Sequence, residues 1–269
     1  MKQTTDDLRA EHAQLAGLAR TLTHSQWAER SAFFGWTPWD EIAHLCFFDE
    51  TALLSATDAS AFASNTAALL ADLGSGREIS AIAREKYAHL DGTTLLTHWE
   101  RVSQKLIEVL AALDSKTRLP WYGPSMSARS FATARLMEAW AHGQDVWDVV
   151  HRRPPVSDRL RHIAHIGVTT FGWSFVNRKR PVPDIIPYVE LRAPQGDELW
   201  TWGDPASPEH VRGEALDFCL LVTQRRNLAD TSLVYSSGAA RNWLQIAQCF
   251  AGAPADAPAP GVRKVVYSD

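Results

Sequence analysis

The chain has 269 residues, of which 45% are hydrophobic and 22% are charged, and its net charge at neutral pH is −4. This balance excludes a nucleic-acid binder, which needs a basic surface, and no apolar run reaches the ~18–20 residues that a membrane span requires. The three cysteines are far apart and the first residues are polar and acidic, so the sequence predicts a cytoplasmic protein with neither a disulfide framework nor a signal peptide.

Helical periodicity marks the start of the chain. Residues 4–22 carry leucines at helical spacing and predict an amphipathic helix. The next helix has a well-defined start, because Thr37 is a good N-cap, Pro38 suits the first helical position, and Asp40 completes a box with the cap. We expect this helix to run to about Ala56.

More helices complete this half of the chain. They are a helix-prone stretch over 58–91 interrupted at 74–76, a helix over 93–114, and, after a loop over 119–127, a helix over 128–152. Pro154 and Pro155 cannot continue a helix, so they mark a domain boundary. Residues 1–153 therefore predict a bundle of four long antiparallel helices with extra short ones.

The remaining residues, 154–269, change in character and predict a small α+β domain. The expected elements are a helix over 157–178, a hairpin of strands at 188–192 and 198–202, a helix over 208–226, a short strand at 232–235 and a helix over 239–250. The Pro- and Ala-rich segment 252–261 predicts little fixed structure. The fold class is thus mainly α, with a helix bundle followed by a small α+β domain.

Glu138 and His142 stand four residues apart in the last helix of the predicted bundle. On a helix such residues share one face, and a carboxylate and an imidazole placed there can ligate one metal ion. An alternative stays open for an isolated pair of this kind. Glu138 could be satisfied by an arginine such as Arg135, with His142 an ordinary core histidine.

His44 adds a third candidate ligand from a second helix of the bundle. Two imidazoles and one carboxylate leave a coordination position for water or substrate, which is typical of catalytic rather than structural zinc. The same set admits iron, nickel or another divalent ion. The sequence therefore predicts an open metal site formed by His44, Glu138 and His142.

Arg225 and Arg226 end an apolar helix of the second domain. A basic residue at a helix C-terminus is favourable by itself, which is one explanation for the pair. The alternative is that one of these arginines binds an anionic group of a substrate held near the metal.

A family resemblance lies in the segment Gly35-Trp-Thr-Pro-Trp-Asp-Glu-Ile-Ala-His44-Leu. It resembles the pattern Gly-Trp-Thr-x-x-Asp-Leu-x-x-His-Leu of the DinB/YfiT-like proteins, in particular the metal-binding domain of mycothiol-dependent maleylpyruvate isomerases. The segment Glu138-x-x-x-His142, followed by Asp148, resembles the second metal segment of that family. The resemblance implies a four-helix metal domain followed by a small α/β domain.

The resemblance also implies that His44, Glu138 and His142 bind one divalent metal, usually zinc, which acts together with a low-molecular-weight thiol. It places a catalytic arginine near the end of a helix in the second domain, where Arg226 stands, with Arg225 as the other candidate. Two segments, 30–34 and 218–226, depart from the isomerase. They indicate a sister subfamily with a substrate other than maleylpyruvate.

The expected function is a metal-dependent enzyme, an isomerase or S-transferase that adds a thiol to a small anionic substrate. Two alternatives remain, a metal-dependent hydrolase that uses an activated water, and a non-catalytic protein that binds a metal or ligand. The expected partner is a small molecule, with neither nucleic acid nor membrane, and the chain is expected to act as a monomer or homodimer.

Overall fold

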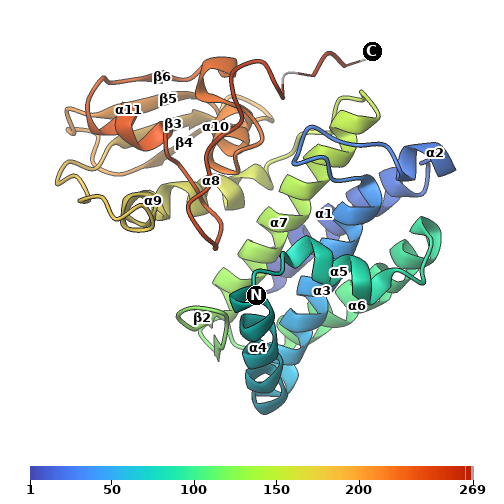
Figure 1. Ribbon diagram of the computed structural model, residues 1–269. Helices are drawn as coiled ribbons and strands as arrows, with labels where there is room; N and C mark the ends of the chain where they lie inside the picture. The colour runs from blue at the N-terminus through green and yellow to red at the C-terminus, as the bar shows by residue number, and fades with distance from the viewer. Residues whose placement is uncertain (264, 268–269) are drawn as a thin grey trace. The chain divides into compact units, whose positions relative to one another are not determined.

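The computed structural model describes residues 1–263 and 265–267. The chain forms two compact units, Met1–Val150 and His151–Asp269 (Figure 1). The boundary expected between residues 153 and 154 lies a few residues beyond the junction of these units at Val150 and His151. That the two units are separate domains stays a prediction. Each unit is described here by itself.

The first unit is helical. Its elements are α1 (Lys2–Ala19), α2 (His24–Trp27), α3 (Pro38–Thr57), α4 (Ala59–Gly74), α5 (Ile79–Tyr87), α6 (Gly92–Ala112), the short strands β1 (Arg118–Leu119) and β2 (Met126–Ser127), and α7 (Ala128–Val149). Helices α1 and α3 each pack against both α6 and α7, which gives a bundle of the long helices (Figure 1). The short strands pair as a small antiparallel hairpin before α7.

The start of α3 follows the capping chemistry expected from the sequence. The backbone N–H of Asp40 donates to the hydroxyl of Thr37, and the backbone N–H of Thr37 donates to the Asp40 carboxylate. The same carboxylate accepts a 2.6 Å bond from Nε of Arg84 in α5. Local sequence thus sets where α3 begins and, with it, the angular position of every later residue on the helix.

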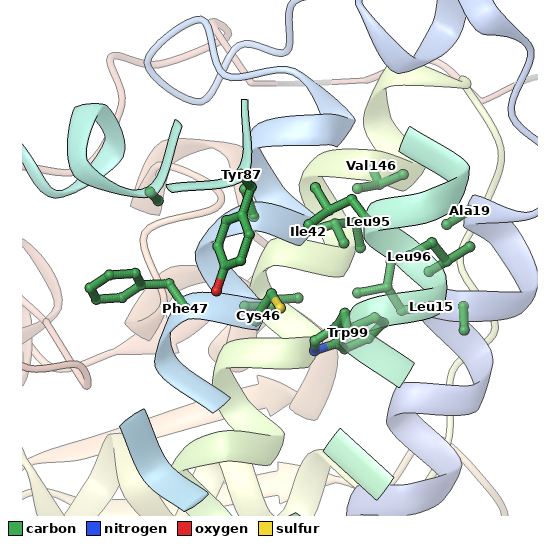
Figure 2. Close-up of a cluster of buried hydrophobic side chains, with 14 of the residues drawn as sticks. Leu15, Ala19, Ile42, Cys46, Phe47, Tyr87, Leu95, Leu96, Trp99 and Val146 are labelled. Atoms are coloured by element: carbon green, nitrogen blue, oxygen red, sulfur yellow. The ribbon is translucent and has the colours of Figure 1, made fainter. Parts of the chain in front are cut away.

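The core of the bundle lies between these helices. Trp99 is its largest wholly buried side chain and is surrounded by aliphatic residues of α1, α3 and α6, as Figure 2 shows. The indole N–H of Trp99 donates to the buried carboxylate of Asp49 at 2.8 Å. The core therefore contains a polar centre as well as apolar packing.

Gly92 begins α6 and leaves room for the buried indole of Trp27. A Cβ at Gly92 would lie 2.3 Å from a ring atom of that indole. We expect Gly92→Ala to lower the free energy of unfolding by about 1–3 kcal/mol through overpacking. The matched control, Gly17→Ala, adds its methyl group in open space on α1 and should raise the stability by up to about 1 kcal/mol. Denaturant midpoints measure both variants, and equal midpoints would contradict this account.

The second unit combines helices with a mixed sheet. Its elements are α8 (Leu160–Thr169), α9 (Phe171–Val176), β3 (Tyr188–Arg192), β4 (Leu199–Trp202), β5 (His210–Glu214), α10 (Ala215–Val222), the short 3-10 helix η1 (Leu228–Asp230), β6 (Val234–Tyr235) and α11 (Ala239–Leu244). The strand order is β4-β3-β5-β6. Strands β3 and β4 form the expected antiparallel hairpin, β3 and β5 are parallel, and α10 packs on β3 and β5.

Two helix predictions in this unit are wrong. The helix expected over 208–226 is a strand, β5, followed by the much shorter α10, because residues 210–214 pair with β3 along their whole length. The helix expected over 157–178 is divided into α8 and α9 at Thr170. The expected fold class is confirmed: the chain is mainly α, with a small α+β part.

The Pro- and Ala-rich segment 252–261 was expected to have little fixed structure, and the structure instead shows it attached to the second unit. Side-chain amides of Gln224 and Asn227 donate to the carbonyl oxygens of Ala255 and Pro258, each at 2.7 Å. Since backbone acceptors need no particular side chain, composition alone did not reveal these contacts. Among the described residues, none of the helices has the length and apolar character needed to cross a membrane.

Candidate metal centre

Helices α3 and α7 of the first unit pack side by side and carry the side chains assigned to a metal from the sequence. Three polar pairs lie along this interface: Glu41 with His142, His44 with Glu138, and Asp49 with Arg135. The residue numbers rise along α3 while those of their partners fall along α7. The two helices are therefore antiparallel, and their packing register decides which side chains meet.

His44, Glu138 and His142 come together at this interface. Nε2 of His44 lies 3.6 Å from Oε2 of Glu138, and Nε2 of His142 lies 3.3 Å from the same oxygen. The centroids of the two imidazole rings are 4.3 Å apart. Each residue offers a ligand atom within 4.8 Å of the other two, a spacing that small side-chain adjustments can close around one ion. Their role as metal ligands stays a prediction.

The charge state of Glu138 suits a cation. Its side chain is 22% exposed. Burial raises the pKa of this carboxyl, but hydrogen bonds and charge attraction from His142 and His44 outweigh burial and hold the pKa well below its usual range. Protonated imidazoles thus favour the ionised form of Glu138, which is also the form that ligates a metal.

The alternative partner for Glu138, Arg135, is engaged elsewhere. Nε of Arg135 lies 2.8 Å from the carboxylate of Asp49, and both side chains are almost wholly buried. Arg135 thus forms its ion pair with Asp49 and not with Glu138, so it does not explain Glu138 as a purely structural residue. This arrangement favours the metal interpretation of Glu138 over the structural one.

Glu41 was not identified from the sequence. Its carboxylate lies 2.6 Å from Nδ1 of His142, on the opposite side of the ring from Glu138, and the residue is wholly buried. The available signal was its position three residues before His44, which places both on one face of α3. Only the packing of α3 on α7 shows which histidine it meets.

Aromatic rings surround the two imidazoles. The ring of Trp36 stacks on that of His142 with an interplanar angle of 14°, and the ring of Phe33 meets His142 edge-on. The ring centroids of Phe48 and His44 are 4.7 Å apart. Phe33 and Trp36 come from the loop before α3, where the neighbouring Phe34 has a φ of 51°. The apolar lining limits the access of water to the sides of both rings.

Two further groups of side chains in the described residues have metal-compatible spacing. One combines Cys46, Glu50 and His98, and the other combines Glu41 with His142 and Asp145. In the first, Glu50 is engaged by Nε2 of His98 at 2.7 Å and also by Lys86, and the positive charge of Lys86 disfavours a cation there. Lys86 therefore disfavours the first group, and the second shares His142 with the site of His44, Glu138 and His142.

Arg225 and Arg226 follow α10 in the second unit. Gln224 has a φ of 57°, and this turn lets the backbone N–H groups of both arginines donate to the carbonyl of Leu220. Both side chains are buried, and Nη2 of Arg226 donates to the Tyr267 hydroxyl at 3.0 Å. The chain therefore holds Arg226 in a defined orientation, and its catalytic role stays a prediction.

Comparison with known proteins agrees with the family resemblance seen in the sequence. Residues 8–147 match the family described as the mycothiol maleylpyruvate isomerase N-terminal domain. Two uncharacterized proteins of Mycobacterium tuberculosis, from strains CDC 1551 and H37Rv, are each 41% identical to this chain over 248 residues, which is 92% of this chain and 95% of the relative.

Two solved structures resemble this chain in fold. The crystal structure of the mycothiol-dependent maleylpyruvate isomerase has a TM-score of 0.55 at 13% identity, and a mutant of that isomerase has a TM-score of 0.52 at 15% identity. Each similarity covers 88% of this chain and 93% of the solved chain. At this level of identity the likeness concerns the fold of the chain.

Proposed function

The chain belongs to the mycothiol maleylpyruvate isomerase N-terminal domain family, and from this premise we propose that it is a metal-dependent enzyme that uses a low-molecular-weight thiol. The proposed reaction is an isomerisation or S-transfer on a small anionic organic substrate. The observation that carries the proposal is the meeting of His44, Glu138 and His142 within 4.8 Å on two packed helices.

The donor set fits a divalent ion such as zinc. His44 and His142 offer imidazole nitrogens and Glu138 offers an ionised carboxylate, which together leave a position open for an exogenous ligand. A divalent metal held there would act as a Lewis acid and lower the pKa of a coordinated thiol or water. The aromatic side chains beside the imidazoles limit the access of water to the sides of the rings, which strengthens the attraction between the carboxylate and a cation.

The cysteines of this chain do not supply the thiol. Cys46, Cys219 and Cys249 are all buried. Burial raises the pKa of the Cys46 thiol to about 12 and raises that of Cys219 well above its usual range. Since the thiolate is the reactive form, Cys46 and Cys219 are poor nucleophiles at neutral pH. A thiol-dependent reaction would therefore need a separate thiol molecule.

The proposal is tested with purified protein, zinc, a panel of thiols that includes mycothiol, and electrophilic unsaturated acids. We expect turnover that needs both the metal and one of the thiols. Turnover that needs the metal but no thiol would contradict the thiol dependence and would favour catalysis by a metal-activated water instead. Tight binding of a small molecule with no turnover would identify a binding protein.

Arg226 is proposed to bind the anionic group of the substrate, with Arg225 as the second candidate. Because a hydrogen bond to a charged group contributes about 1.5–3 kcal/mol, Arg226→Gln should raise KM for the anionic substrate by about 10- to 100-fold. Metal content should not change. The matched control is Arg178→Gln, which removes a guanidinium that pairs with Asp256. An unchanged KM in Arg226→Gln would contradict the assignment.

A further inference from the structure

We propose that Glu41 is a positioning residue of the metal centre, which fixes the tautomer and orientation of His142. Its carboxylate meets Nδ1 of His142 at 2.6 Å, inside the packed interface of α3 and α7. This inference rests on the proposed metal-dependent function, and it assigns a role to a residue that does not itself contact the metal.

The contact with Glu41 would decide which ring nitrogen of His142 carries the proton, provided that the carboxylate is ionised. An ionised carboxylate can only accept, so Nδ1 of His142 must be the donor to Glu41. In a neutral imidazole the lone pair then belongs to Nε2, which is the atom 3.3 Å from Glu138. Glu41 therefore directs the ligating nitrogen of His142 towards the two other candidate ligands.

The fold keeps this carboxylate in place at a position that favours a negative charge. Glu41 lies in the first turn of α3, where the helix dipole favours a negative charge. His142 is 5% exposed, so water does not compete for its ring nitrogens. A buried carboxylate behind a ligating imidazole makes the imidazole a stronger metal donor.

The position of His142 between two carboxylates adds a second argument. Glu41 lies at one ring nitrogen and Glu138 at the other. A neutral imidazole has one proton, so with Nδ1–H donated to Glu41 its Nε2 lone pair would face the Glu138 oxygen and repel it. A cation at Nε2 removes this repulsion. Either a metal ion or a second proton could fill that role, and the following experiment separates these two cases.

The test is the zinc affinity of the full chain, measured by competition with a chromophoric chelator. Glu41→Gln keeps the volume and an acceptor oxygen but removes the charge, and we expect an affinity about 10-fold lower. Glu41→Leu removes both charge and acceptor, and we expect a loss of about 100-fold. The graded loss is not expected if Glu41 only fills space.

A matched control comes from the same helix. Glu50→Gln changes a carboxylate that meets His98 at 2.7 Å, on a different face of α3, and zinc affinity should stay at the wild-type value. A second readout is the Nδ1 proton of His142, followed by NMR in the zinc-loaded protein. It should exchange slowly in wild type and be lost to fast exchange in Glu41→Leu.

The outcomes are distinguishable. Wild-type zinc affinity in both Glu41 variants would overturn this inference alone. A wild-type protein that binds no zinc would overturn the proposed function together with this inference. If Glu41→Leu does not fold, Glu41→Gln decides the question by itself, since it preserves the shape of the interface.

Discussion

Replacing His44 by alanine is expected to reduce zinc affinity by more than about 100-fold. This is more than the loss of about 10- to 100-fold that follows when a residue hydrogen-bonded to a metal ligand is replaced. His44 supplies one of two imidazoles, and its Nε2 lies 3.6 Å from the Glu138 carboxylate. Without it, two protein ligands remain, too few for a stable zinc site of this kind. Metal content after dialysis, measured by elemental analysis, reports the loss directly.

The matched control for this variant is His98→Ala. His98 lies in the same bundle and forms a metal-compatible group with Cys46 and Glu50, but it is not part of the proposed centre. Its replacement should leave metal content unchanged. If His98→Ala released the metal and His44→Ala retained it, the ion would belong to the Cys46 group and the assignment of the centre would be wrong.

Replacing Arg135 by methionine is expected to lower the free energy of unfolding by about 3–5 kcal/mol, which is a large part of the stability of a domain. The cause is the carboxylate of Asp49, which is wholly buried and would lose its ion pair with Arg135 while its charge remained. Trp99 still donates one hydrogen bond to it. Denaturant unfolding followed by circular dichroism measures the effect.

Two further variants separate charge from packing. Adding Asp49→Asn to Arg135→Met leaves no charge behind and keeps an acceptor for Trp99, so much of the stability should return. The exposed control, Arg9→Met, breaks a surface pair with Asp6 and should change the stability by less than about 1 kcal/mol. A small effect of Arg135→Met, comparable with that of Arg9→Met, would show that the buried pair contributes little.

Much of the helical half was predictable because its signals are local. The cap at Thr37, with Pro38 and Asp40, involves residues within one helical turn, and the structure starts α3 at that point. The family resemblance, carried by the segment that contains His44, is confirmed by the match over residues 8–147. Glu138 and His142 share a face because helix geometry alone places i and i+4 together.

The second half was predicted less well because its strands depend on distant partners. Residues 210–214 were expected to be helical, yet they form β5 because β3, some twenty residues earlier in the chain, offers a strand with which to pair. The attachment of 252–261 depends likewise on side chains such as Gln224 and Asn227 that are remote in sequence. No pattern within either segment contains that information.

The candidate site shows the same division. The sequence by itself determined that His44 and the pair Glu138 and His142 lie on helix faces suited to one metal ion. Only the tertiary structure decided that these faces meet, that Arg135 belongs to Asp49, and that Glu41 stands behind His142. The reason is physical: the spacing within one helix is fixed by its own hydrogen bonds, whereas the register between two helices is fixed by how their side chains pack.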